Sequence, residues 1–139
     1  MRALLEEETR ALLNFAKVGR LGCVVDGEPY IVPINYLFED GAIYGHSLPG
    51  RKLEALRAHP RACLQVDEIR DDFNWRSAIA YGNFEEIRVP SERKSILGKL
   101  LARFPLLTPV ESLIVDDANA PDSVVFCIRI DRITGMAEG

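Results

Sequence analysis

The sequence has little of several features that mark other classes of protein. Its 139 residues include only three cysteines, Cys23, Cys63 and Cys127, which lie far apart in apolar stretches and are expected to be reduced core residues. No apolar run approaches the roughly 20 residues of a membrane-spanning helix. Neither a Gly-x-Gly-x-x-Gly nor a P-loop motif occurs. We therefore expect a soluble cytoplasmic protein without a membrane contact, a structural metal or a Rossmann dinucleotide site.

The chain also has fewer basic than acidic residues. Lys and Arg number 17 against 21 Asp and Glu, for a formal net charge of -4, so the chain lacks the basic field that drives nucleic-acid binding. Any bound phosphate must be met by a few local cations, which favours a small phosphorylated ligand. With 47% hydrophobic residues, the chain can bury a core, and its length fits a single domain over residues 1–139.

What the chain does contain is a succession of strand patterns. Apolar runs bounded by turn-forming residues predict strands at about 21–25, 30–38, 42–47, 62–67, 75–88 and 123–132. Helical spacing of apolar residues predicts helices at 4–16, 51–58 and 91–104. Asp26-Gly27 and Asp40-Gly41 are expected to close tight turns, whereas residues 70–74 and 105–122 are expected to form loops. Short links between successive strands predict a mainly β fold, an antiparallel barrel of six strands with flanking helices.

The predicted strand at 30–38 has two unusual features. It is apolar at nearly every position, which predicts coverage on both faces. Pro33 lacks the N–H group that a strand ladder needs, so it marks an edge position or a bulge. We expect the barrel to be open at this strand.

Polar residues gather where the third strand ends and the second helix begins. His46 and Ser47 end the strand, and Arg51 and Lys52 begin the helix. A helix N-terminus offers unpaired N–H groups to an anion, and a cation is disfavoured there unless an anion is bound. The segment can therefore hold a phosphate monoester. Solvated surface charges are the alternative interpretation of this pair, and His46 is either a proton donor or a hydrogen-bonded strand-end residue.

Five segments together carry a family resemblance. They are Val18-Gly19-Arg20-Leu21-Gly22, residues 26–34, Ile43-Tyr44-Gly45-His46-Ser47, Gly50-Arg51-Lys52, and Trp75-Arg76-Ser77 followed by Gly82. In this order and spacing they resemble the flavin-binding split barrels of the pyridoxamine 5'-phosphate oxidase-like family. The resemblance covers about residues 18–87 and implies a six-stranded antiparallel split barrel of the FMN-binding type.

The resemblance also implies an FMN site. Residues 32–35 are expected to run along the flavin ring, Arg51 and Lys52 to hold the flavin phosphate, and the later strand to add a polar contact through Ser77. The cofactor-binding residues implied in this way are Val32, Pro33, Ile34, Asn35, His46, Ser47, Arg51, Lys52 and Ser77. The flavin of this family lies between two subunits, which implies a homodimer.

The resemblance favours one branch of the family. The only tryptophan is Trp75, so the chain lacks the C-terminal Trp and Arg segment of the vitamin-oxidising members, and His46-Ser47 is closer to nitroimidazole-resistance-type proteins. We expect an FMN-dependent oxidoreductase of a small molecule, nitroreductase-like, with His46 as the catalytic proton donor and possible use of a nicotinamide donor. The alternative is a non-catalytic protein of the same fold that binds flavin, deazaflavin or haem.

Overall fold

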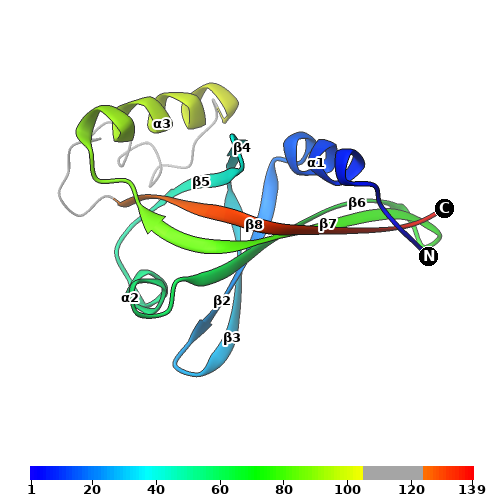
Figure 1. The fold of residues 1–139 in the computed structure, drawn as a ribbon, viewed down its shortest axis with the longest axis horizontal. Helices are drawn as coiled ribbons and strands as arrows, with labels where there is room; N and C mark the ends of the chain where they lie inside the picture. Colours follow the sequence, from blue (N-terminus) through cyan, green and yellow to red (C-terminus); the bar gives the residue numbers. More distant parts are fainter. Residues whose placement is uncertain (105–123) are drawn as a thin grey trace.

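The computed structural model describes residues 1–104 and 124–139 and consists of one curved antiparallel sheet with three helices around it (Figure 1). The strands are β1 (Arg2–Ala3), β2 (Val18–Val25), β3 (Glu28–Asn35), β4 (Leu37–Glu39), β5 (Ala42–Ser47), β6 (Arg61–Asp71), β7 (Asn74–Glu86) and β8 (Val124–Glu138). The helices are α1 (Glu6–Phe15), α2 (Arg51–Ala58) and α3 (Pro90–Arg103). The predicted mainly β split barrel with flanking helices is confirmed, with the short β1 and β4 in addition to the six expected strands. The predicted loop at 105–122 lies outside the described residues.

Two strands that follow each other in the sequence form the two opposite edges of the sheet. The strand order is β3-β2-β6-β7-β8-β5-β4, with β1 paired to β8, so β3 and β4 lie at opposite ends although they are neighbours in sequence. Pro33 therefore sits on an edge strand, as expected. The predicted strand at 30–38 is in fact two strands, because the chain passes from one edge to the other at Tyr36.

Tyr36 explains this break. Its side chain is fully buried in the main core, and its hydroxyl donates a hydrogen bond to the backbone oxygen of Leu13 in α1. Burial is the main reason why the pKa of Tyr36 is raised to about 12, and Arg103 acts in the opposite direction. The inward-pointing Tyr36 thus anchors the chain to α1 at the point where it passes from one edge strand to the other.

The turns and the second hairpin follow from local sequence. Asp26 and Gly27 have φ values of 52° and 79°, which suits the tight turn predicted between β2 and β3. The loop predicted at 70–74 is shorter in the structure, because β6 runs to Asp71 and β7 begins at Asn74, which leaves a hairpin turn at Asp72 and Phe73. The Asp71 carboxylate accepts hydrogen bonds from the Phe73 N–H at 2.8 Å and from the Asn74 amide at 2.9 Å, which closes the turn.

Three helices cover parts of the sheet. Leu12 and Leu13 of α1 and Leu53 and Leu56 of α2 are buried in the main core inside the curve of the sheet. A second apolar cluster lies under α3, which covers β5 and β8 through Ile96, Leu97 and Leu100. Cys23 and Cys127 are buried and Cys63 is half-buried, all as free thiols, as the sequence predicted.

The other face of β2 and β3 is left open in the described part of the chain. Ile31 of β3 is 70% exposed, and Val18 and Val24 of β2 are 51% and 52% exposed. The prediction that the strand at 30–38 is covered on both faces is therefore wrong for the single chain. This surface is called here the open face.

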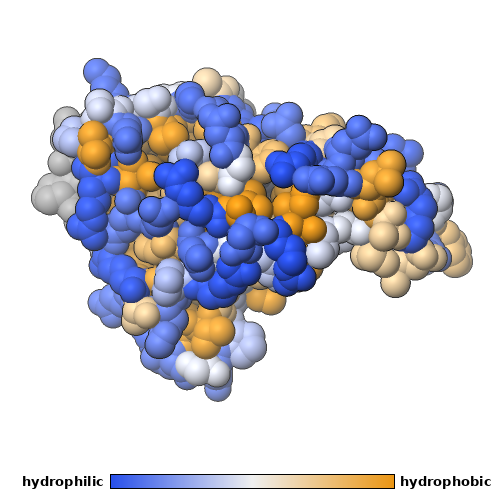
Figure 2. Space-filling model, viewed as in Figure 1, coloured by the Kyte–Doolittle hydropathy of each residue, from blue (hydrophilic) through white to orange (hydrophobic). Residues whose placement is uncertain are grey.

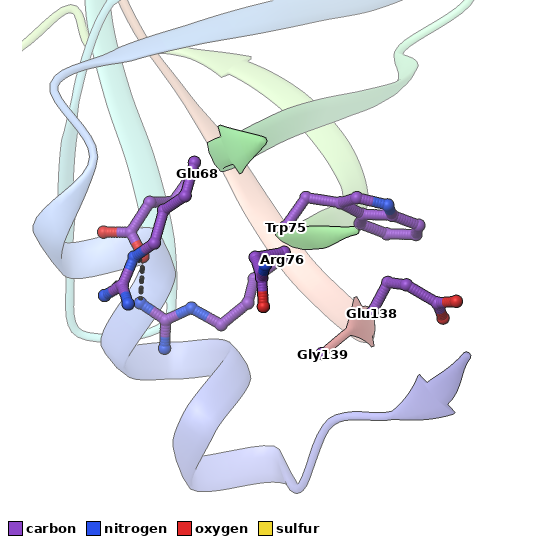
Figure 3. Close-up of a pocket in the computed structure, with 7 residues that line it drawn as sticks. Glu68, Trp75, Arg76, Glu138 and Gly139 are labelled. Carbon is purple, nitrogen blue, oxygen red and sulfur yellow. Dashed lines mark hydrogen bonds and ion pairs between the residues drawn. The ribbon is translucent and has the colours of Figure 1, made fainter. Parts of the chain in front are cut away.

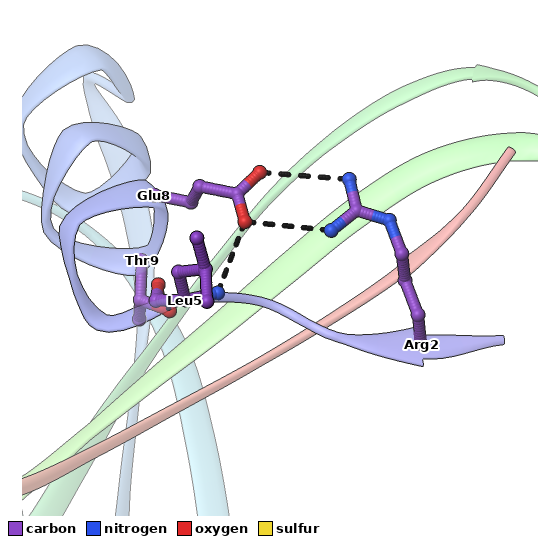
Figure 4. A network of polar contacts seen from close by, with 4 residues as sticks. All are labelled: Arg2, Leu5, Glu8 and Thr9. Carbon is purple, nitrogen blue, oxygen red and sulfur yellow. Dashed lines mark hydrogen bonds and ion pairs between the residues drawn. The ribbon is translucent and has the colours of Figure 1, made fainter.

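The N-terminus of α1 is fixed by a compact polar network (Figure 4). The Glu8 carboxylate accepts a hydrogen bond from the Leu5 N–H at 3.0 Å and pairs with Arg2 at 3.4 Å. These contacts, the backbone one first, lower the pKa of Glu8. Thr9, the buried polar residue of α1, donates its hydroxyl hydrogen to the Leu5 oxygen at 3.0 Å.

Among the described residues, no helix combines the length and apolar character needed to cross a membrane.

Candidate functional site

Most of the predicted site residues come together in a groove between β3, the end of β5 and the start of α2. A hollow of about 410 Å³ is lined by Val18, Pro33, Ile34, Asn35, His46 and Lys52. β3 and β5 are not hydrogen-bonded neighbours, so only the curl of the sheet brings residues 33–35 to His46. This groove is the opening of the split barrel.

β3 can offer backbone groups to a ligand in this hollow. It pairs with β2 alone in the described part of the chain, so every second residue of β3 directs its backbone groups away from β2, and Pro33 can offer only a C=O because it has no N–H. Val32 and Ile34 pack against the main core, which fixes the strand in place. The backbone contact expected from residues 32–35 stays a prediction, and residues 33–35 lie along the hollow where it would be made.

A second, larger hollow continues from the first. It has a volume of about 650 Å³ and is lined by Val25, Asp26, Glu28, Pro29, Tyr30, Ser47, Leu48, Gly50, Arg51, Lys52 and Leu53. Lys52 lines both hollows. Figure 1 shows α2 beside the hairpin of β2 and β3, and Figure 2 shows polar side chains interspersed with apolar ones over this lower part of the molecule.

Lys52 has an unusual environment for a lysine. Its side chain is half-buried, and no carboxylate of the described residues pairs with it. Burial lowers the pKa of Lys52, while nearby Cys23 acts in the opposite direction. A partly desolvated ammonium group that has no counter-ion within the described part of the chain favours a site for an anion.

Arg51 behaves differently from its neighbour. It is well exposed and forms an ion pair with Asp26 in the turn between β2 and β3. Both side chains are more than two-thirds exposed, so the pair contributes only about 0–1 kcal/mol. It nevertheless links the hairpin to the start of α2 across the mouth of the second hollow.

The N-terminus of α2 lies at the junction of the two hollows. Gly50 precedes the helix in an extended conformation, and no side chain caps the first N–H groups. Ser47 lines the second hollow and donates its hydroxyl hydrogen to the Leu48 oxygen at 2.9 Å. The junction therefore combines helix N–H groups with the Lys52 ammonium.

Ser77 lies apart from this groove. Its hydroxyl accepts a hydrogen bond from the Gln65 amide at 3.0 Å, and the Gln65 amide also donates to Asp67 at 3.1 Å. Arg20 of β2 donates to both Gln65 and Asp67. These residues alternate with the buried Leu64, Val66 and Ala78, so they lie on the open face. Within one chain, Ser77 does not join the other predicted site residues.

Eight of the residues that line the second hollow, with Asp26, Glu28 and Tyr30 among them, were not predicted site residues. Asp26, Glu28 and Tyr30 come from the turn and from the first half of β3. The alternation of side chains along β3 was the available signal, because Glu28 and Tyr30 share a face with Val32 and Ile34. The sequence did not show that α2 would lie over that face.

A separate small hollow lies at the far end of the long β6–β7 hairpin (Figure 3). It has a volume of about 210 Å³, and Glu68, Trp75, Arg76 and Glu138 are among the residues that line it. Glu68 pairs with Arg76 at 2.9 Å, so these two charges satisfy each other. None of the predicted site residues lies there.

Comparison with known proteins identifies the family. A family model described as pyridoxamine 5'-phosphate oxidase matches residues 6–137. The chain belongs to this family. An uncharacterized protein of Rhizobium meliloti (strain 1021) is 29% identical over 146 residues, covering 99% of this chain and 95% of that protein.

Two solved structures of the same shape add detail. An FAD-binding protein from Mesorhizobium loti is 32% identical, with a TM-score of 0.81, over 99% of this chain and 98% of that chain. A proposed 5-nitroimidazole antibiotic resistance protein from Bacteroides thetaiotaomicron VPI-5482 is 21% identical, with a TM-score of 0.77, over 96% of this chain and 85% of that chain. The second likeness shows the fold alone.

Proposed function

We propose that this protein binds a flavin nucleotide in the groove between β3, β5 and α2. The observation that carries the proposal is the half-buried Lys52, which pairs with no carboxylate of residues 1–104 or 124–139 and lies where the two hollows meet the N-terminus of α2. A phosphate there is met by an ammonium group and by helix N–H groups. The residues present therefore fit a phosphate-bearing cofactor.

The first hollow suits the flavin ring. The outer edge of β3 lies along this hollow, where Pro33 offers a backbone C=O and Ile34 supplies apolar surface. The sequence predicts FMN, whereas the Mesorhizobium loti protein is named as an FAD-binding protein. Both cofactors share the ring, the ribityl chain and the first phosphate, and it is this shared part that we assign to β3 and Lys52.

An oxidoreductase is the activity we propose for the loaded protein. Bound flavin supplies hydride or electron transfer, and the protein supplies position and electrostatics. His46 lines the first hollow, so its imidazole is placed to give a proton to a small-molecule substrate beside the ring. A nicotinamide is the electron donor we propose, and a nitro-aromatic or quinone-like compound is the substrate class.

A homodimer with the flavin at its interface is part of the proposal. The open face carries Ile31, Val18 and Val24, and covering it with a second copy removes this apolar surface from water. Ser77 lies on the same face, so its predicted polar contact is made to the cofactor of the partner subunit.

We place the protein in the cytoplasm, where its three free thiols stay reduced.

The first test is the visible spectrum of the purified protein before and after loading with flavin and desalting. We expect retained flavin bands, and we expect Lys52→Ala to lose about tenfold or more in flavin affinity because a charge-assisted contact to phosphate is removed. Lys94→Ala, an exposed change on α3, is the matched control and leaves affinity unchanged.

The same preparation separates the competing functions. Bleaching of the flavin bands by a nicotinamide donor supports the oxidoreductase. Bound flavin that no donor reduces supports a carrier, and a haem-like band supports haem binding instead. A protein that retains no flavin, or a Lys52→Ala variant that binds it normally, contradicts the proposed site.

A further inference from the structure

Four polar side chains form a hydrogen-bonded network across three neighbouring strands of the open face. They are Arg20 of β2, Gln65 and Asp67 of β6, and Ser77 of β7. Arg20 stands opposite Gln65 in the pairing of β2 with β6, and Asp67 stands opposite Ser77 in the pairing of β6 with β7. The register of the three strands therefore places the four side chains side by side.

The direction of the hydrogen bonds in this network is fixed by groups that have only one role. A guanidinium group only donates, so the side-chain oxygen of Gln65 is the atom that faces Arg20, at 3.2 Å. The Gln65 NH2 group is thereby turned the other way, where it donates to Asp67 at 3.1 Å and to Ser77 at 3.0 Å. A carboxylate only accepts, which agrees with this orientation of the amide.

The network leaves the Ser77 hydroxyl as a hydrogen-bond donor. Its oxygen accepts the Gln65 amide hydrogen, and its own hydrogen has no acceptor among residues 1–104 and 124–139. Arg20 and Asp67 form an ion pair at 3.1 Å, so covering the network buries no net charge. Ser77 therefore offers a neutral donor to whatever covers the open face.

We propose that Gln65 is a positioning residue of the flavin site, which holds the Ser77 hydroxyl as a donor to an acceptor atom of the flavin ring in the partner subunit. The inference rests on the flavin site and the homodimer proposed above. Reduction of a bound flavin adds negative charge to the acceptor atoms of its ring. Because a hydrogen bond to a charged group is roughly twice as strong as a neutral one, the Ser77 donor stabilises the reduced cofactor more than the oxidised one.

Asp67 is the reason why Ser77 needs Gln65. It stands directly opposite Ser77, so its carboxylate competes for the hydroxyl hydrogen. The Gln65 NH2 group donates to both side chains, which satisfies the carboxylate and leaves the hydroxyl hydrogen free to point outward. Without the amide, we expect the hydroxyl to turn towards Asp67 and to leave the flavin without its donor.

The test measures the reduction potential of the bound flavin, and it does not depend on turnover. The full chain is loaded with FMN or FAD, whichever it retains after desalting, and titrated with a reductant beside a dye of known potential. Wild type, Ser77→Ala, Gln65→Leu and the double variant are compared. We expect each single variant to lose about tenfold in affinity for reduced relative to oxidised flavin, which lowers a two-electron potential by about 30 mV.

The double variant tests whether Gln65 acts through Ser77. If it does, Gln65→Leu changes the potential no further in the Ser77→Ala background. Asn83→Leu makes a matched control, because it removes an exposed side-chain amide from β7, and it is expected to keep the wild-type potential. Gln65→Ala repeats the test with a smaller side chain in case the leucine variant does not fold.

The possible outcomes separate this inference from the proposed function. A wild-type potential in the Gln65 variants, or additive shifts in the double variant, overturns the inference and leaves the flavin site standing. A monomeric wild type that binds flavin also overturns it, because Ser77 lines neither hollow of its own chain. A wild type that retains neither flavin overturns the proposed function itself.

Discussion

Tyr36 is the residue at which the polypeptide leaves one edge of the sheet and begins the other. Replacing it by Phe keeps the buried ring and leaves the Leu13 carbonyl at the end of α1 without its donor. We expect Tyr36→Phe to lower the free energy of unfolding by about 1–3 kcal/mol, measured by urea denaturation at neutral pH. Tyr30→Phe, which alters a partly exposed tyrosine, is expected to change it by less than about 0.5 kcal/mol.

Tyr36 also makes stability depend on alkaline pH. The folded protein holds its phenol protonated up to a pKa of about 12, against an ordinary value of 10.0. This contribution to stability is complete below pH 10 and is lost as the pH rises towards 12, a change of roughly 2–3 kcal/mol. The alkaline loss of stability should be shallower in Tyr36→Phe than in the wild type. Parallel curves for the two proteins would contradict this assignment.

Arg51 and Lys52 show how far a motif can be interpreted residue by residue. The sequence predicts that both residues hold the flavin phosphate. Adjacent residues on a helix, however, point in directions that differ by about 100°. In the structure Arg51 points to solvent and pairs with Asp26, while Lys52 turns into the groove. The position of the hairpin relative to α2 decides which cation is available, and this position depends on contacts far apart in sequence.

At the scale of elements, the pairing of β7 with β8 contains an irregularity next to Gly82. The register shifts between Tyr81 and Gly82, and a Cβ at Gly82 would lie 2.0 Å from the Arg129 backbone oxygen. Backbone cannot move aside as a flexible side chain can. We expect Gly82→Ala to cost about 1–3 kcal/mol or more in unfolding free energy, seen as a lower Tm in thermal denaturation.

Gly98 provides the matched control for this change. It lies in α3, and apart from the neighbouring backbone of the helix itself a Cβ there meets no atom of the described residues within 4 Å. Gly98→Ala is expected to raise stability by about 0.5–1 kcal/mol, because alanine favours a helix interior and restricts the unfolded chain. A Gly82→Ala protein as stable as the wild type would show that the close approach of the Arg129 backbone does not limit this position. A destabilised Gly98→Ala would show that the position in α3 is not open to a side chain.

At the scale of the whole molecule, the open face is the surface through which we propose that two copies of the chain associate. Ile31 lies on it with most of its side chain in solvent. We expect the wild type to sediment as a dimer in analytical ultracentrifugation, and Ile31→Glu to shift it to the monomer by placing a charge in the interface. Val89→Glu, a change before α3 on an exposed apolar residue, should leave the dimer intact. A monomeric wild type refutes the proposed dimer.

The sequence by itself determined the elements whose signals are local. The turn at Asp26-Gly27, the helix at Arg51–Ala58 and the edge position of Pro33 follow from φ preferences, apolar spacing and a missing N–H group. Family motifs with fixed spacing also identified the fold and brought His46, Lys52 and residues 33–35 into one candidate site.

Only the tertiary structure decided what depends on the curl of the sheet. In the structure the apolar run is interrupted at Tyr36 and Ile31 is exposed. Ser77 lies on the open face, and a second hollow is found beside Tyr30. Each of these features depends on which strands and helices meet across long sequence separations. Such contacts are set by the packing of the whole core, so a local pattern of residues does not predict them.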